Sequence, residues 1–305
     1  MMQKSIKNIV SFAGVGLHSG NNVNVRILPA AEDTGIIFVR TDVPGSQPIQ
    51  ANVSNVVATN YATSLGVNGV KVSTVEHILA AFYGLGIDNA VVELDGPELP
   101  ALDGSAELLV SMIEGVGVVE LESSRKYMVI KEPIKVTDGD KHLLLLPASG
   151  KGLEIDYSID FSHPILSKQT YRCMLSGELF KTEIASARTF GFLRDVEMLR
   201  ANGLAKGGSL HNAVVIGETE VLNEGGLRYP DEFVRHKVLD LMGDLSLVGS
   251  PVVGYLIANR SGHALNAKLA NKILSRPSSW EYVDYSSDDD IAGVQHDFIQ
   301  KTATL

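Results

Sequence analysis

His77-Ile78-Leu79-Ala80-Ala81-Phe82-Tyr83-Gly84 and His236-Lys237-Val238-Leu239-Asp240-Leu241-Met242-Gly243 are two similar stretches with the composition of helices. In each of them, seven positions lead from a histidine to a glycine. They differ at one informative position, because Asp240 stands where the first stretch has Ala81. We expect two helices of the same kind, one in each half of the chain, with the fold organised around them.

The two histidines and the aspartate form a candidate metal site. His236 and Asp240 are spaced i, i+4, so on a helix their side chains share one face. If the two helices pack as a pseudo-symmetric pair, His77 joins them. Two imidazoles, one carboxylate and a vacant fourth position are the ligand set of a catalytic zinc ion. Taken singly, these residues are more often ordinary packed or exposed side chains, and only their matched positions favour the metal site.

Length, charge and cysteine content limit the classes of protein to consider. A chain of 305 residues is long enough for two domains, each with its own core. The formal net charge of -10 argues against a general nucleic-acid binder. Cys173 is the single cysteine, which excludes an internal disulfide and a cysteine-based zinc site. We find no apolar run long enough for a signal peptide or a membrane span and expect a cytoplasmic protein.

The two halves resemble each other beyond the histidines, which indicates an internal repeat. Residues 25–30 (Val-Arg-Ile-Leu-Pro-Ala) are similar to residues 143–148 (Leu-Leu-Leu-Leu-Pro-Ala), and a second β-rich run follows each. The polar stretch 122–126 has the composition of a linker. We therefore predict a first domain at residues 1–124 and a second domain at residues 125–305.

In each half the predicted strands come before most of the predicted helices. The β-rich runs cover about 9–70, 90–94, 127–160 and 252–257, and the helical patterns about 73–84, 105–114, 176–186, 231–247 and 264–275. This grouping favours an α+β fold in which each domain packs a sheet layer against a helix pair. Residues 188–225 are rich in glycine and indicate an insertion in the second domain. The run at 286–290, acidic at its end, is typical of a solvated surface segment.

Glu76 directly precedes His77 and has two competing interpretations. It stands three residues after Ser73, so residues 73–76 fit a capping box at a helix start. A zinc hydrolase, however, needs a carboxylate beside the metal to take the proton of the attacking water. Glu76 can supply it, although the pattern is not the H-E-x-x-H motif of the common zinc proteases. Both interpretations stay open on this evidence.

His263 follows a predicted strand and opens a predicted helix. With Ser261 as the cap, it is an ordinary histidine at a helix start. As a functional group, it is a general acid for a leaving amine or an electrostatic partner of an oxyanion. A helix N-terminus lowers the pKa of a histidine, so a protonated role needs a carboxylate nearby. Asp244, one turn beyond Asp240, is the candidate, although it can also be an ordinary surface acid.

Two further polar residues are weaker candidates. Thr189 lies in a loop that is polar and then aromatic, and its hydroxyl can donate a hydrogen bond to an oxyanion. Turn and packing roles are more common for such a loop. Lys237 follows His236 but belongs to a different helix face, so a solvated lysine is its default interpretation.

Motifs along nearly the whole chain resemble the zinc-dependent UDP-3-O-acyl-N-acetylglucosamine deacetylases of lipid A biosynthesis. The matching stretches occur in the family's order, which makes the resemblance highly specific. They are 14–20 (Gly-Val-Gly-Leu-His-Ser-Gly), 73–77 (Ser-Thr-Val-Glu-His), 84–89 (Gly-Leu-Gly-Ile-Asp-Asn), 103–106 (Asp-Gly-Ser-Ala), 187–192 (Ala-Arg-Thr-Phe-Gly-Phe), 231–237 (Asp-Glu-Phe-Val-Arg-His-Lys), 240–244 and 261–266 (Ser-Gly-His-Ala-Leu-Asn).

The resemblance implies two similar α+β domains with the active site between them. It implies water attack on an acetamide carbonyl polarised by zinc, then protonation of the glucosamine nitrogen, which releases the free amine and acetate. This reaction is the committed step of lipid A biosynthesis. The implied roles are metal ligands at His77, His236 and Asp240, a general base at Glu76, a general acid at His263, an oxyanion contact at Thr189, and support from Lys237 and Asp244.

The same resemblance places a hydrophobic passage for the 3-O-acyl chain in the insertion. Apolar or small residues suit such a passage, although core packing explains any one of them. The substrate-binding candidates are Phe192, Leu193, Val196, Gly208, Leu210 and Val215 along the chain, with Lys141 and Phe161 at the nucleotide end and Arg260 near the diphosphate. His211 departs from the family, because many relatives have an acid at this position.

Three interpretations remain open. The favoured one is a zinc amidohydrolase that acts on a nucleotide-linked acylated glucosamine. The second is a metal-dependent hydrolase with the same scaffold and another substrate. The third is a binding protein with a structural metal, which needs a fourth protein ligand such as His263. The ligand set suits Fe²⁺ as well as Zn²⁺, and nothing in the chain demands more than a monomer.

Overall fold

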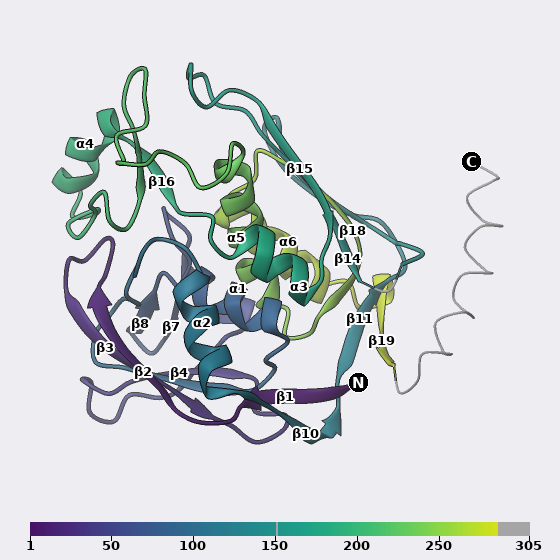
Figure 1. Cartoon of the computed structure of the whole chain (residues 1–305). Coiled ribbons are helices and arrows are strands. Elements are labelled where there is room, and N and C mark those ends of the chain that lie inside the picture. The colour runs from purple at the N-terminus through teal and green to yellow at the C-terminus, as the bar shows by residue number, and fades with distance from the viewer. Residues whose placement is uncertain (151, 286–305) are drawn as a thin grey trace, which may run out of the picture.

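A layer of helices lies between two β-sheets in the computed structural model, which describes residues 1–150 and 152–285 (Figure 1). The acidic run predicted at 286–290 lies outside the described residues. We call residues 1–124 the first half and residues 125–285 the second half. No helix in the described part of the chain is long and apolar enough to cross a membrane.

The first half contains a five-stranded sheet, a three-stranded sheet and two main helices. Its sheet orders are β2-β3-β9-β4-β5 and β6-β7-β8, and β1 pairs separately with β10. The elements are β1 (Met2–Ile6), β2 (Val10–Val15), β3 (Asn22–Pro29), β4 (Ile36–Arg40), β5 (Ile49–Gln50), a 3-10 turn (Val53–Asn55), β6 (Val56–Ala58), β7 (Ser64–Val67), β8 (Val70–Ser73), α1 (Glu76–Leu85), β9 (Ala90–Leu94), α2 (Glu107–Val116) and β10 (Val118–Ser124).

The second half contains a seven-stranded sheet, a small two-stranded sheet and its own helices. The main sheet runs β12-β13-β18-β11-β19, with β14 paired to β18 and to β15. The elements are β11 (Lys126–Ile130), β12 (Ile134–Asp138), β13 (Lys141–Leu146), β14 (Leu153–Ile159), β15 (Gln169–Met174), α3 (Gly177–Leu179), a π turn (Phe180–Ile184), β16 (Phe190–Phe192), a 3-10 turn (Leu193–Asp195), α4 (Val196–Ala201), β17 (Val214–Ile216), α5 (Glu232–Ser246), β18 (Val252–Asn259), α6 (His263–Leu274), a 3-10 turn (Pro277–Ser279) and β19 (Trp280–Asp284).

The two main sheets share one topology, which confirms the repeat expected from the sequence. In the first, β3 is antiparallel to β2 and β9, β9 is parallel to β4, and β4 is antiparallel to β5. In the second, β12-β13-β18-β14-β15 repeats these directions in the same order. The helices correspond as well, since α1 and α2 flank β9 along the chain as α5 and α6 flank β18. The predicted α+β class is therefore confirmed.

Alternating burial explains why the sheets present one face to the helices. Successive side chains of a strand point to opposite faces, so every second residue enters the core. On β3 the buried residues are Val23, Val25 and Ile27. On β14 they are Leu153, Ile155, Tyr157 and Ile159.

α1 and α5 lie against each other at the centre of the molecule, and each is buried along most of its length. A Cβ atom added at Gly243 would lie 2.0 Å from the carbonyl oxygen of Glu76. One added at Gly84 would lie 2.1 Å from the ring of Phe180. Gly84 and Gly243 therefore each allow a close approach of a neighbouring segment. This packing requirement accounts for a glycine at the same position in both stretches, seven residues after the histidine.

Several elements differ from the sequence predictions. Residues 122–124 belong to β10 and Lys126 to β11, so only Arg125 separates two strands where a polar linker was predicted. Their polarity is compatible with β10 because, among the described residues, this strand pairs with β1 alone and stays largely exposed. β1, β15 and β19 were not predicted, and the helix predicted at 176–186 is a short α3 followed by the π turn.

Candidate metal centre and active site

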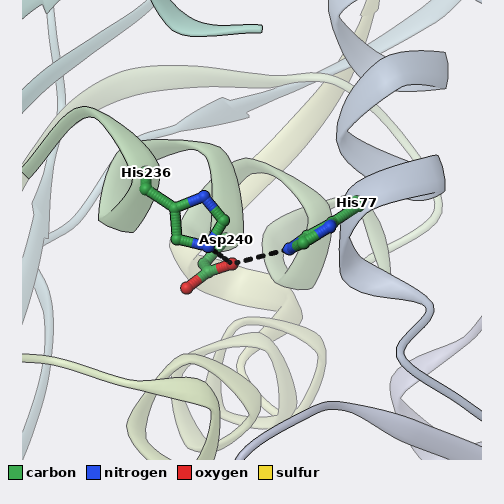
Figure 2. Close-up of side chains that lie close together, drawn as sticks. All are labelled: His77, His236 and Asp240. Carbon is green, nitrogen blue, oxygen red and sulfur yellow. Dashed lines mark ion pairs between the residues drawn. The ribbon is translucent and has the colours of Figure 1, made fainter. Parts of the chain in front are cut away.

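His77, His236 and Asp240 converge where α1 meets α5 (Figure 2). One potential ligand atom from each of the three residues lies within 4.8 Å of the others, and all three residues are buried. Nε2 of His236 is 3.3 Å and Nε2 of His77 is 3.7 Å from Oδ1 of Asp240. The helix packing thus brings His77 to the i, i+4 pair on α5, as the similar stretches predicted.

A backbone carbonyl orients the ring of His236. Nδ1 of His236 is 3.0 Å from the carbonyl oxygen of Ala187, so the proton lies on Nδ1 and is donated to that oxygen. Nε2 is left unprotonated on the side of Asp240. A hydrogen bond of this kind fixes the tautomer and ring direction of metal-binding histidines.

The segment before α1 shows that Glu76 is not part of a capping box. Ser73 ends β8, and its hydroxyl is 2.9 Å from that of Ser64 on β7. Thr74 follows with a φ of 59°, a left-handed conformation that is rare for a β-branched residue and that separates the strand from the helix. α1 then begins without a side-chain cap, and Oε2 of Glu76 accepts a hydrogen bond from the backbone N–H of Thr63 at 2.9 Å. The capping interpretation is therefore wrong.

His263 begins α6 and lies against Asp244 of α5. The distance between Nδ1 of His263 and Oδ2 of Asp244 is 2.8 Å, and the amide of Asn266 donates to the same oxygen. Ser261 does not cap the helix, because its hydroxyl is paired with that of Tyr157 at 2.7 Å. Asp244 is a buried partner of His263 and not a surface acid.

Lys237 is not a solvated lysine. Its Nζ atom is 2.5 Å from Oδ2 of Asp240, and only 15% of its side chain is exposed. The i, i+3 spacing places it on the same side of α5 as the aspartate. The ammonium group therefore lies at the edge of the metal cluster.

The protonation states of the cluster suit metal binding. Burial and the neighbouring His236 lower the pKa of His77 to about 3, despite the opposite effect of Asp240. Burial also lowers the pKa of His236. Burial disfavours a charged Asp240, but the electrostatic interactions with His236 and with the Lys237 ammonium outweigh it and hold the pKa of Asp240 well below its usual range. Neutral imidazoles and an ionised carboxylate are the forms that bind metals.

Glu76 and His263 have pKa values displaced in the same direction by different causes. Burial raises the pKa of Glu76 to about 7, against the opposing effect of His263. Burial alone would lower the pKa of His263, but the carboxylate of Asp244 beside it raises the value to about 9. Near neutral pH, Glu76 can thus accept a proton while His263 carries one.

A cavity of about 710 Å³ opens over the cluster. Among its lining residues are His77, His236, Asp240, Glu76, His263, Thr189, Lys237, Lys141, Phe161, Phe192, Leu193, Val196, Gly208, Leu210, Val215 and Arg260, all predicted from the sequence. Asp244 lies behind His263 and is not part of the lining. His211 is exposed and is also outside the lining.

Contacts between the two halves shape this cavity. Thr189 is held by its backbone N–H, which donates to the carbonyl of Gly104 at 2.7 Å. The N–H of Gly207 in the insertion donates to the carbonyl of Leu17 at 3.1 Å. The motifs at 14–20 and 103–106 therefore support the insertion from the first half.

His18 is a cavity residue to which the sequence interpretation gave no role. Both of its ring nitrogens are buried and have no hydrogen-bond partner among the described residues. Oε1 of Glu98 accepts from the backbone N–H of His18, and Oε2 from that of Ser19, which fixes the loop. The only signal for His18 in the sequence was its membership of the 14–20 motif.

The three clustered residues fit a catalytic metal ion. Two imidazole nitrogens and one carboxylate oxygen converge, and the cavity leaves space for a further ligand. No fourth histidine, cysteine, aspartate or glutamate joins the cluster within the described part of the chain. Nδ1 of His263 is engaged by Asp244, and its Nε2 is 4.0 Å from Asp240. The donor set is thus that of an open site and not of a closed structural one.

Comparisons with known proteins agree with this geometry. The model of the LpxC family, UDP-3-O-acyl N-acetylglycosamine deacetylase, matches residues 3–275. The UDP-3-O-acyl-N-acetylglucosamine deacetylase of Myxococcus xanthus (strain DK1622) is 50% identical over 281 residues, which cover 92% of this chain and 89% of the relative. The deacetylase of Syntrophus aciditrophicus (strain SB), with the same name, is 47% identical over 291 residues, 95% of this chain and 92% of the relative.

A third relative of the same name, from Shewanella loihica (strain ATCC BAA-1088 / PV-4), is 46% identical over 295 residues, 95% of each chain. The match therefore extends over both repeats, the insertion and every element that supplies a residue to the cavity. The chain belongs to the UDP-3-O-acyl-N-acetylglucosamine deacetylase family.

Proposed function

We propose that this protein hydrolyses the N-acetyl group of UDP-3-O-acyl-N-acetylglucosamine, giving UDP-3-O-acyl-glucosamine and acetate in lipid A biosynthesis. The observation that carries the proposal is the buried His77, His236 and Asp240 cluster, which opens on a cavity also lined by Glu76 and His263. The names of the relatives supply the substrate. The cluster supplies a reason why an amide bond can be cleaved there.

His77, His236 and Asp240 would hold the metal ion, for which we propose Zn²⁺, with Fe²⁺ as an alternative in the cell. When bound, the ion would act as a Lewis acid that polarises the amide carbonyl and lowers the pKa of water beside it. Lys237 supports the site by keeping Asp240 ionised and oriented through its ion pair.

Glu76 is the proposed general base. Its raised pKa, about 7, suits a group that removes a proton from water near neutral pH. The proton passes to the carboxylate while the water oxygen forms a bond to the carbonyl carbon. The hydroxyl of Thr189, at the wall of the cavity, donates a hydrogen bond to the oxygen on which negative charge develops.

His263 is the proposed general acid. Its Nδ1 atom is bonded to Asp244, so Nε2 is the nitrogen available for proton transfer. When the C–N bond breaks, Nε2 gives its proton to the glucosamine nitrogen, which leaves as the amine. The acyl carbon departs as acetate with the oxygen that came from water.

The remaining lining residues would select the substrate. We assign the 3-O-acyl chain to the lining residues of the insertion and the nucleotide end to cationic and aromatic lining residues outside it. The residues are Phe192, Leu193, Val196, Gly208, Leu210 and Val215 for the acyl chain, and Lys141, Phe161 and Arg260 for the nucleotide end. We also propose domains at 1–124 and 125–305 with the site between them, in a monomeric, cytoplasmic protein.

The test is metal content and deacetylase activity, measured together on wild type, His236→Ala and His211→Ala. We expect one equivalent of metal in wild type and in His211→Ala, because the exposed His211 is outside the cluster. His236→Ala should lose metal and activity together. An active wild-type protein without metal would refute the metal mechanism, and a metallated protein inactive on this substrate would refute the proposed reaction.

A further inference from the structure

Thr63 uses every polar group it has to join two parts of the active site. This buried residue directly precedes β7 and does not line the cavity. Its backbone N–H donates to Oε2 of Glu76 at 2.9 Å, and its hydroxyl donates to Oδ1 of Asp244 at 2.5 Å. Its carbonyl accepts the N–H of Val75 at 3.3 Å, which ties it to the start of α1.

The hydroxyl of Thr63 completes the hydrogen bonds of Asp244. Oδ2 of this carboxylate contacts Nδ1 of His263 and the amide of Asn266, each at 2.8 Å. Oδ1 has Thr63 as its partner. Because Asp244 is buried, a lost hydrogen bond on Oδ1 is not replaced readily by water. Both carboxylate oxygens of Asp244 are thus held by hydrogen bonds. The orientation of this carboxylate in turn sets the orientation of the His263 imidazole.

We propose that Thr63 is a positioning residue that holds Glu76 and the Asp244–His263 pair in one fixed arrangement. The inference rests on the proposed function, in which Glu76 and His263 move the two protons of the reaction. One residue thereby sets the positions of a carboxylate on α1 from the first half and an imidazole at the start of α6 from the second. Thr63 touches no reacting atom and acts only through these groups.

This arrangement predicts an effect on turnover more than on substrate binding. If the hydroxyl is removed, Asp244 can rotate about its side-chain bonds and His263 follows. Proton transfer depends on distances within hydrogen-bond reach, so small displacements reduce the rate. The cavity wall that contacts substrate is unchanged, because Thr63 is not part of it.

The kinetic experiment compares Thr63→Val, Thr63→Ser and Ser64→Ala with wild type. Valine keeps the size of threonine without the hydroxyl, and serine keeps the hydroxyl. Ser64→Ala removes the neighbouring hydroxyl, which contacts Ser73 on β8. We expect kcat to fall about tenfold in Thr63→Val with KM within about twofold, and both constants within about twofold of wild type in the other two variants.

A spectroscopic experiment detects the displacement of His263 directly and does not depend on enzyme activity. The proton on Nδ1 of His263, bonded to a carboxylate, should give its own resonance in the NMR spectrum of the metal-loaded protein. His263→Gln identifies it by its loss. We expect the resonance to shift in Thr63→Val and to stay in place in Thr63→Ser and Ser64→Ala.

A folded Thr63→Val with wild-type kcat, or with an unshifted His263 resonance, would overturn the positioning role. An equal loss of kcat in Ser64→Ala would show that the paired strands β7 and β8 matter only for general stability. If the wild-type protein were inactive on the acetylated substrate, the proposed function would be refuted instead. The NMR resonance of His263 would still test the positioning role of Thr63, because it does not depend on activity.

Discussion

Glu76 has one carboxylate oxygen engaged by the fold and is part of the cavity wall. Oε2 accepts from Thr63, and the residue lines the cavity beside His77. Glu76→Gln keeps the shape but cannot accept the proton of water, so kcat should fall by about 10² to 10⁴. Bound metal should remain, as measured by elemental analysis, because Glu76 is not in the ligand cluster.

His77→Ala is the matched contrast at the adjacent position, since it removes a ligand and should lower bound metal together with activity. If folded Glu76→Gln turned over substrate like wild type, Glu76 would not be the base. If it lost metal as His77→Ala does, Glu76 would instead belong to the metal cluster.

At the residue scale, the sequence predicted which three residues cluster better than it predicted their surroundings. His77, His236 and Asp240 followed from helix periodicity and the repeat, which are regular patterns. The capping box at 73–76 was wrong because the left-handed Thr74 interrupts the chain there, and the pattern of residue types does not reveal that φ angle. Thr63 was missed because its partners are 13 and 181 residues away and no periodicity links them.

At the scale of elements, the contact between α1 and α5 depends on Gly243. Its hydrogen faces the backbone of Glu76, and an added Cβ would lie 2.0 Å from that carbonyl oxygen. Gly243→Ala should therefore push the helices apart and lower the free energy of unfolding by about 1–3 kcal/mol, the usual cost of overpacking a core. Metal affinity should fall too, because the proposed ligands come from both helices.

Gly115→Ala provides the matched control. We expect this substitution to raise the free energy of unfolding, whereas Gly243→Ala lowers it. Gly115 lies in α2 with no atom within 4 Å of an added Cβ, so alanine only improves helix propensity. Urea denaturation should show stabilisation by about 0.5–1 kcal/mol. Equal stability of Gly243→Ala and wild type would show that the two helices can move apart without cost.

The insertion should determine which acyl chains are accepted. Leu210 lines the cavity, and its backbone carbonyl is held by the amide of Asn223 at 2.8 Å. Leu210→Glu should raise KM most for substrates with long chains, because a charge then lies along their apolar path. Met198→Glu is the control, since Met198 is equally exposed on α4 but outside the cavity lining. An equal effect of Leu210→Glu on short and long chains would contradict the passage.

The central elements of the repeats were predictable because their apolar residues recur at the spacing of a helix or a strand, whereas the edge elements were not. α5 and β18 were found close to their observed bounds. Residues 122–124 of β10 were mistaken for part of a linker because all three are polar and none of them is buried. The π turn at Phe180–Ile184 has the composition of an ordinary helix, so residue types alone do not distinguish the two.

At the scale of the whole molecule, the metal cluster joins the two repeats. His77 comes from the first half, and His236 and Asp240 come from the second, so a bound ion would link both. The duplication could be predicted from residues 25–30 and 143–148, although the order of the strands could not. The contacts of the insertion with the 14–20 loop could not, because they join backbone groups and leave no mark on residue types.

Removal of the metal should therefore destabilise the whole protein. A ligand that binds only the folded state adds about 2.7 kcal/mol when its free concentration is 100 times Kd. A chelator should lower the urea midpoint of wild type and restored metal should raise it again. His77→Ala and Asp240→Ala should unfold at the same urea concentration with and without chelator, because each lacks a ligand. The chelator could remove the metal from the wild-type protein and leave its urea midpoint unchanged. That result would mean that the ion does not hold the two repeats together.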